Sequence, residues 1–139
     1  FAEGNNRAAA LAPSRWIACL NPDAFPEPGW LAALVEAGER TGAAAVGSLQ
    51  LRDDDPALLD GVGDVLSIGG VGWRGGYLRP RRDYDLVEAE IFGPCAAAAL
   101  YRRDAFEAVG GFDPRFFAFF EDIDLGFRLR LAGWRAVFA

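Results

Sequence analysis

Apolar and polar positions in the first third of the chain follow two periods that together predict a strand, a helix and a second strand. Residues 15–21 ("RWIACLN") form an apolar run that ends in Asn-Pro, which is typical of a buried strand followed by a turn. Residues 43–49 ("AAAVGSL") predict another buried strand. Between them, residues 28–41 predict a helix that begins at Pro28, ends at Gly42 and carries four apolar side chains on one face (Trp30, Leu31, Leu34 and Val35). This order favours a parallel sheet in an α/β protein.

The middle of the chain, from Gln50 to Glu90, changes to glycine, aspartate and arginine, with short β-like pieces such as "DVLSIGG" and "GYLRP". We interpret it as a hairpin or a long functional loop. The formal dinucleotide-binding pattern in "GGVGWRGG" is better explained as a glycine-rich turn, because no helix pattern follows it. Further on, "EIFGPCAAAALYRR" predicts a return to strand, and "RDAFEAVGGF" predicts a short helix that a glycine pair ends.

The last segment, "FFAFFEDIDLGFRLRLAGWR", has a mixed pattern. Its apolar positions alternate strictly, which taken alone indicates a strand (Ile123, Leu125, Phe127, Leu129 and Leu131). Three other signals favour a helix: acids at the start with arginines towards the end, Asp124 and Arg128 four residues apart, and an Ala-Gly stop. We therefore expect a helix that starts near Glu121 and is buried on two sides.

Length, composition and charge narrow the classes of protein. At 139 residues and 52% hydrophobic, the chain fits one domain, and its net charge of −6 argues against a nucleic-acid partner. No apolar run approaches the roughly 20 residues of a membrane span. Two cysteines in apolar surroundings predict buried thiols, and we expect a cytoplasmic location. Because the chain starts without methionine and stops inside a predicted strand, we expect it to be a piece of a longer protein.

Two acidic stretches are candidates for chemistry. Asp23 follows a predicted strand at the position where α/β proteins bind ligands, and it is either a plain turn residue or a ligand of Mg²⁺ or Mn²⁺. The acids of "FFEDIDLGFR" are either a helix start that complements the dipole or the source of a general base. In the second case, burial against the phenylalanines and the adjacent carboxylates would raise the pKa of one of these acids.

Three stretches together resemble family-two inverting glycosyltransferases, close to their rhamnosyltransferase-like branch. They are "EGNNRAAA", "CLNPDAFPEPGWLAALV" and the segment from "FGPCAAAALYRR" to "LAGWR", in the order of the family's blocks. The resemblance implies a Rossmann-like GT-A fold with a mostly parallel sheet and a hairpin insertion at residues 50–90 on the acceptor side. It also implies that residues 1–139 are an incomplete catalytic domain, without the N-terminal nucleotide-binding strands and a downstream histidine, and inactive alone.

The resemblance further implies roles for individual residues. Asp23 is the expected ligand of Mn²⁺ or Mg²⁺, and Asn21 stands at the first position of the family's Asp-x-Asp element. Asp122 is the expected general base, and its neighbour Glu121 the expected substrate-binding carboxylate. Four other residues are expected near the donor, two at the nucleotide and two in the loop beneath the sugar (Asn5, Asn6, Gly93 and Pro94).

From these observations we expect metal-dependent, inverting transfer of a sugar in bacterial polysaccharide or cell-envelope synthesis. The expected partners are a nucleotide-diphosphate-sugar donor and a carbohydrate or lipid-linked acceptor. A poor nucleophile and a charged leaving group call for a carboxylate base and a metal, and the sequence offers candidates for both. The alternative is a non-catalytic carbohydrate-binding or scaffolding domain, and a nucleotidyltransferase is a weaker one.

Overall fold

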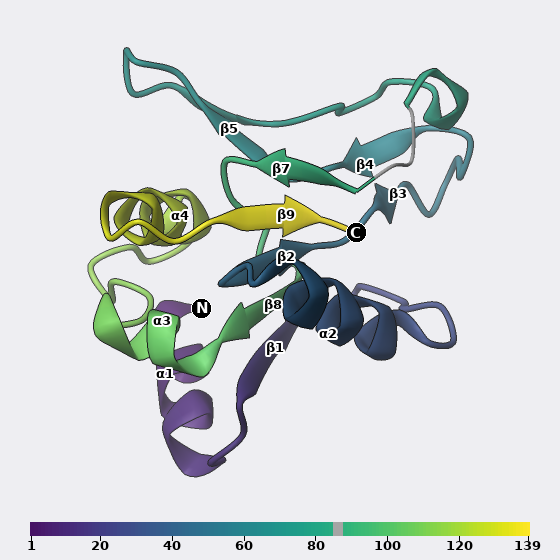
Figure 1. The fold of residues 1–139 in the computed structure, drawn as a ribbon. Coiled ribbons are helices and arrows are strands. Elements are labelled where there is room, and N and C mark those ends of the chain that lie inside the picture. The colour runs from purple at the N-terminus through teal and green to yellow at the C-terminus, as the bar shows by residue number, and fades with distance from the viewer. Residues whose placement is uncertain (85–87) are drawn as a thin grey trace.

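The structure is a computed structural model that describes residues 1–84 and 88–139 (Figure 1). Its helices are α1 (Ala2–Leu11), α2 (Trp30–Thr41), α3 (Arg103–Ala108) and α4 (Glu121–Leu131), with a short 3-10 helix at Arg81–Asp83. Its strands are β1 (Trp16–Leu20), β2 (Ala45–Gly47), β3 (Gln50–Leu51), β4 (Leu59–Gly61), β5 (Asp64–Leu66), β6 (Gly72–Arg74), β7 (Ala89–Ile91), β8 (Ala98–Arg102) and β9 (Ala136–Phe138). Within the described ranges, no helix combines the length and the apolar character that crossing a membrane requires.

The main sheet has the strand order β1-β8-β2-β9-β7. Strand β8 pairs antiparallel with both β1 and β2, β9 pairs parallel with β2, and β7 pairs antiparallel with β9. The expected α/β class is confirmed, but the expectation of a mostly parallel sheet is wrong. The β1-α2-β2 unit does place two strands in the same direction, but β8 lies between them and runs the opposite way.

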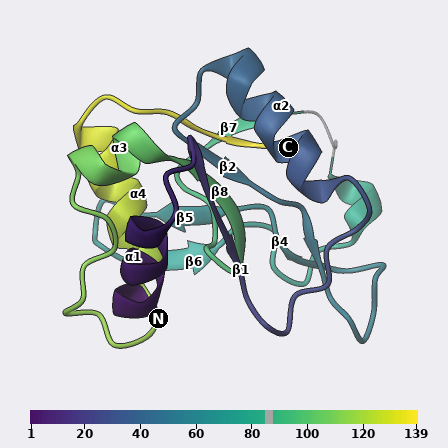
Figure 2. The same cartoon turned by 90° about the horizontal axis from the view of Figure 1, so that it is seen from below.

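Helices cover both faces of this sheet, as Figures 1 and 2 show. Helix α2 packs on one face, where its Leu34 and Ala37 meet Val46 of β2 and Leu100 of β8. The core on the other face joins α1, α3 and α4 to side chains of β1, β2, β8 and β9. The alternation of side chains along β8 sends Leu100 to one core and Tyr101 to the other. A sheet buried on both sides explains the continuous apolar runs in the sequence.

Helix α2 matches its prediction at one end only. It ends where Gly42 takes a left-handed conformation (φ 69°) and donates its N–H to the carbonyl oxygen of Gly38. Its start at Trp30 follows Gly29, which has φ 88°, so the expectation that Pro28 begins the helix is wrong. The left-handed glycine separates the proline from the first helical turn.

Helix α4 starts at Glu121 and ends before Gly133, as expected. Asp124 and Arg128 form an ion pair at 2.6 Å. The expectation of burial on two sides is wrong, because Leu125 and Leu129 are buried on one face while Phe127 and Leu131 are exposed. The helix meets the sheet along a single stripe, and the alternating pattern has no structural counterpart.

The region from residue 50 to residue 90 contains two hairpins, β3-β4 and β5-β6, which confirms the hairpin interpretation. "DVLSIGG" supplies β5 and the turn after it, in which Ser67 bonds back to the backbone of Val71. "GYLRP" was expected to be β-like and is so only in part: residues 76–78 form a turn in which Leu78 has φ 60°, while Pro80 forms an isolated antiparallel bridge with Leu58. The segment expected to return to strand forms β7 and β8 with a loop at residues 92–97 between them.

Candidate functional site

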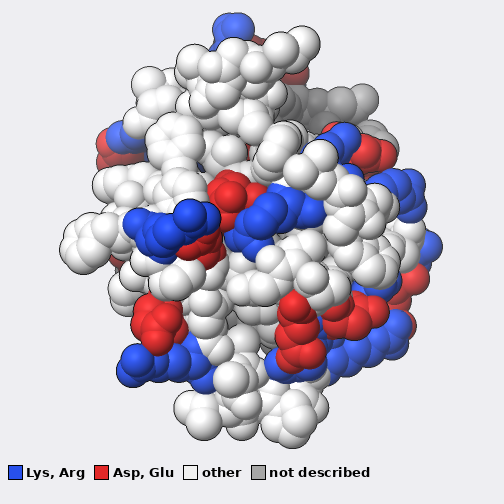
Figure 3. Space-filling model, turned by 90° about the vertical axis from the view of Figure 1, so that its left-hand side faces the viewer, with Lys and Arg blue, Asp and Glu red and all other residues white. Residues whose placement is uncertain are grey.

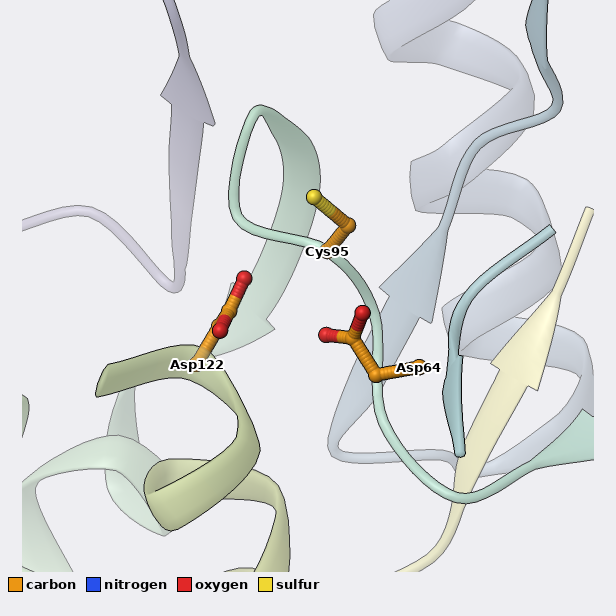
Figure 4. Close-up of side chains that lie close together, drawn as sticks. All are labelled: Asp64, Cys95 and Asp122. Carbon is orange, nitrogen blue, oxygen red and sulfur yellow. The ribbon is translucent and has the colours of Figure 1, made fainter. Parts of the chain in front are cut away.

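Three polar side chains from distant parts of the sequence converge beside the start of α4. Asp64 comes from β5, Cys95 from the loop at residues 92–97, and Asp122 from the first turn of α4. One ligand atom from each residue lies within 4.8 Å of those from the other two. Figure 4 shows the three side chains directed towards a common space. The arrangement brings two carboxyl groups and a thiol into one small volume.

Two hydrogen bonds and one close approach of the backbone hold these three elements together. The N–H of Ala96 donates to Oδ2 of Asp122 at 3.1 Å, and the N–H of Asp64 donates to the carbonyl oxygen of Gly93 at 2.8 Å. The loop passes very close to α4, since a Cβ atom on Gly93 would lie 3.3 Å from the Cα atom of Gly126. Because Gly93 and Gly126 have no side chains, the backbones of the loop and of α4 can approach closely. This close approach fixes the position of Asp122 relative to the loop.

Two acids of the site, Asp64 and Glu121, are almost completely buried. Asp64 is only 6% exposed, and its Oδ2 atom has no hydrogen-bond partner among the described residues. Burial, and then the negative charge of Asp122, raise the pKa of Asp64 to about 7, although Arg74 opposes this. Glu121 is 7% exposed, and burial raises its pKa as well. At neutral pH the two acids therefore favour the protonated form more than exposed carboxyl groups do.

The thiol of Cys95 is also buried, and burial raises its pKa to about 11. Cys19 is buried too, so the expectation of two buried free thiols is confirmed. A protonated thiol is a weak ligand for hard ions such as Mg²⁺ and Mn²⁺, which prefer oxygen. The group formed by Asp64, Cys95 and Asp122 therefore suits these ions poorly.

The expected position of Asp122 below the loop agrees with the structure, and Asp124 points elsewhere to pair with Arg128. The expected role of the phenylalanines is wrong. Phe117, Phe119 and Phe120 are 93%, 81% and 48% exposed, so they do not shield the acids from water. Phe119 and Phe120 both have left-handed φ angles. Asp64 is buried instead where β5 meets the loop at residues 92–97, since its N–H donates to the carbonyl oxygen of Gly93.

Asp23 and Asn21 lie in the turn after β1, outside the group around Asp122. The side chain of Asp23 is exposed. The N–H of Asn21 donates to the carbonyl oxygen of Ala97 at 2.8 Å, so the turn begins next to the same loop. An exposed carboxylate suits a hard ion that also binds phosphate oxygens. Asp23 offers one exposed carboxylate donor for such an ion, and its assignment as the ligand of Mn²⁺ or Mg²⁺ stays a prediction.

The side chains of Asn5 and Asn6, which were expected near the nucleotide, form hydrogen bonds to the protein backbone. The side chain of Asn6 donates to the carbonyl oxygen of Phe112 at 2.7 Å and accepts from the Phe112 N–H at 3.0 Å. The side chain of Asn5 donates to the carbonyl oxygen of Phe1. Both lie on α1, a helix that the apolar pattern did not predict because only Ala2 and Ala9 are buried along it.

Replacing Asn6 with Ala should destabilise the chain by about 1–3 kcal/mol, because the N–H and carbonyl groups of Phe112 lose their partner. Urea unfolding measures this change. Asn5→Ala is the matched control and should cost less, since its single bond is exposed. If Asn6→Ala leaves stability unchanged and weakens nucleotide binding instead, the interpretation of Asn6 as a structural residue is wrong.

Gly93 and Pro94 are both buried in the loop at residues 92–97. They shape this loop through their backbone, and their place beneath a donor sugar stays a prediction. Sequence reasoning missed Asp64 as a site residue. Its only signal was an acid at the head of the β-like piece "DVL", and its burial depends on contact with a loop almost 30 residues away.

Charges of both signs lie side by side on the face drawn in Figure 3, where blue and red side chains alternate among white ones. Ion pairs of opposite charges occur along the chain, such as Arg128 with Asp124 and Arg115 with Asp113. This face has no broad basic area of the kind that neutralises a nucleic-acid backbone. The absence of a nucleic-acid partner stays a prediction.

Comparison with known proteins relates the chain to enzymes of sugar transfer. Residues 1–110 match the family described as glycosyl transferase family 2. The chain is 35% identical over 135 residues to a Mycobacterium tuberculosis protein named N-acetylglucosaminyl-diphospho-decaprenol L-rhamnosyltransferase; the alignment covers 88% of this chain and 44% of that protein. It is 31% identical over 147 residues to the O-antigen biosynthesis protein RfbC of Myxococcus xanthus, covering 96% of this chain and 11% of RfbC.

Among solved structures, the fold is similar to that of GalNAc-T7, which was crystallised with UDP, GalNAc and Mn²⁺. The TM-score is 0.72 at 13% identity, and the match covers 99% of this chain and 28% of the other. This likeness confirms the expected GT-A fold. The chain spans less than half the length of the mycobacterial relative.

Proposed function

The chain belongs to glycosyltransferase family 2, and we propose that it forms part of a catalytic domain that transfers a sugar, with inversion, from a nucleotide-diphosphate donor to an acceptor hydroxyl. The observation that carries this proposal is the position of Asp122, whose carboxylate is held by the N–H of Ala96 at the start of α4. The process is polysaccharide or cell-envelope synthesis in a bacterium, as the names of the two relatives suggest.

The proposed step is a single displacement. A carboxylate oxygen of Asp122 accepts the proton of the acceptor hydroxyl while that hydroxyl oxygen forms a bond to the anomeric carbon. The bond from the anomeric carbon to the diphosphate oxygen breaks on the opposite side, and its electron pair leaves with the diphosphate. Attack and departure on opposite faces invert the anomeric configuration. When bound, Mn²⁺ or Mg²⁺ neutralises charge on the diphosphate, and we assign Asp23 to hold it.

The acceptor side of the proposed site is the region from residue 50 to residue 90. A pocket of about 440 Å³ lies there, lined by three aromatic and two arginine side chains (Trp73, Arg74, Tyr77, Arg79 and Tyr84) together with Gly76. Aromatic faces pack against sugar rings, and arginines bind phosphate oxygens. We therefore propose a sugar carried on a lipid diphosphate as the acceptor, in line with the name of the mycobacterial relative.

Replacing Asp23 with Ala in the full-length protein should raise the Mn²⁺ concentration needed for half-maximal transfer by about tenfold or more, because the ion loses a charged oxygen ligand. The fold should survive, since Asp23 is exposed in a turn. The assay uses N-acetylglucosaminyl-diphospho-decaprenol as acceptor, a panel of uridine, thymidine and guanosine diphosphate sugars as donors, and a titration of Mn²⁺.

Asp54→Ala is the matched control, since Asp54 is an exposed acid that pairs with Arg52. It should leave the metal dependence unchanged. If the Asp23→Ala protein keeps wild-type turnover and wild-type metal dependence, Asp23 is not the metal ligand.

A further inference from the structure

Asp64 is a buried acid for which the proposed step has no role. It is more than nine-tenths buried, yet its Oδ2 atom has no hydrogen-bond partner among the described residues. Leaving a polar atom buried and unbonded costs free energy, so such atoms in native proteins call for an explanation. In Figure 4 the carboxyl group points towards Asp122 and Cys95. Both observations point to a ligand that supplies the absent hydrogen bond.

The spacing of the two carboxyl groups suits one bridging oxygen atom. Oxygen atoms of Asp64 and Asp122 lie within 4.8 Å of each other, but no direct hydrogen bond joins them. A hydroxyl oxygen that bonds to two groups at about 2.8 Å spans roughly that separation at a bent angle. A hydroxyl placed between them would therefore reach both side chains.

We propose that Asp64 is a second carboxyl group of the acceptor site, where it holds the reacting hydroxyl against Asp122. This inference rests on the proposed function, because it assumes that Asp122 is the base. The acceptor hydroxyl donates its hydrogen to Asp122 and accepts a hydrogen bond from the protonated carboxyl group of Asp64. Its remaining lone pair stays free to attack the anomeric carbon. No proton leaves Asp64 during the step.

The surroundings favour the protonated form of Asp64 that this role requires. Asp122 and Glu121 face it from α4, Cys95 from the loop, and Arg74 from β6, and Arg74 is itself paired with Asp60 of β4. Tyr101 of β8 stays neutral, because complete burial, and to a smaller extent the charge of Asp64, raise its pKa. Burial and the two acids raise the pKa of Asp64 to about 7 despite Arg74. Above that pH the carboxyl group loses the hydrogen that it donates.

The test compares Asp64→Ala and Asp64→Asn in the full-length protein, with the same donors and lipid acceptor. Asp64→Ala should lower kcat/KM for the acceptor by about 10- to 100-fold, because the hydroxyl loses its orienting group. Asp64→Asn keeps a donor at every pH and should stay within about threefold of wild type at pH 6.5. The wild type should lose kcat/KM as the pH rises through about 7, and Asp64→Asn should lose this decline.

Two further readouts and one control variant keep the outcomes separate. The donor KM and the circular dichroism spectrum should be unchanged in both variants, and Asp54→Asn should behave as wild type. If the wild type transfers sugar and both Asp64 variants match it, or both are equally inactive at every pH, the role of Asp64 is refuted while the proposed function stands. If the wild type transfers no sugar from any donor, the proposed function fails and the role of Asp64 fails with it.

Discussion

Asp122→Asn is expected to lower kcat of the full-length protein by about 10²- to 10⁴-fold, the usual cost of removing a general base. The substituted side chain has nearly the same shape, and its amide oxygen can still accept the N–H of Ala96. It cannot take up the proton of the acceptor hydroxyl. Because the donor does not contact this proton, the donor KM should change little. Steady-state kinetics with varied donor and acceptor concentrations measure both quantities.

Asp124→Asn is the matched control, two residues along the same helix. Asp124 pairs with Arg128 at 2.6 Å, and their side chains are 24% and 26% exposed. Loss of this largely buried, doubly hydrogen-bonded pair should cost about 1–3 kcal/mol in stability and leave kcat near the wild-type value. If Asp124→Asn abolishes turnover and Asp122→Asn does not, the two roles are reversed. If neither variant changes turnover, the acidic start of α4 is only structural.

The parts of the fold that could be predicted depend on local sequence. Gly42 marked the end of α2 because a left-handed C-terminal residue is a local requirement. The start of α4 at Glu121 followed from its charges and from the spacing of Asp124 and Arg128. The place of β8 between β1 and β2 could not be predicted, because strand order depends on contacts between segments that are far apart in the sequence.

In the candidate site, too, local sequence predicted one residue and missed another. Asp122 could be predicted, since its place in a family block and in the first turn of a helix is visible in the sequence. The part played by Asp64 could not, because its burial arises only when β5 bonds to Gly93 and the loop packs on Gly126. The phenylalanines before α4 led to a wrong prediction. Apolar residues next to acids suggested a shield, but Phe117, Phe119 and Phe120 are exposed in the structure.

The second large effect is on stability, and it concerns Asp64→Asn. The pKa of Asp64 is about 7 in the folded chain, against about 3.9 for an unfolded aspartate. Between these values the folded state binds a proton that the unfolded state does not. The free energy of unfolding must therefore fall as the pH rises through this window, by up to about 4 kcal/mol at pH 7 and above. The penalty is absent below pH 4, where both states are protonated.

Asp64→Asn removes the titrating group, so the variant should be more stable than wild type at pH 8 and differ much less at pH 5. Urea unfolding of both chains at the two pH values measures this difference. Asp113→Asn is the matched control: Arg115 lowers the pKa of Asp113 to about 2, so this acid is ionised in both states across the window and its loss should not alter the pH dependence. Equal pH dependence in wild type and Asp64→Asn would show that Asp64 ionises normally in the folded protein. The hydrogen that its carboxyl group is proposed to donate to the acceptor would then be absent at neutral pH.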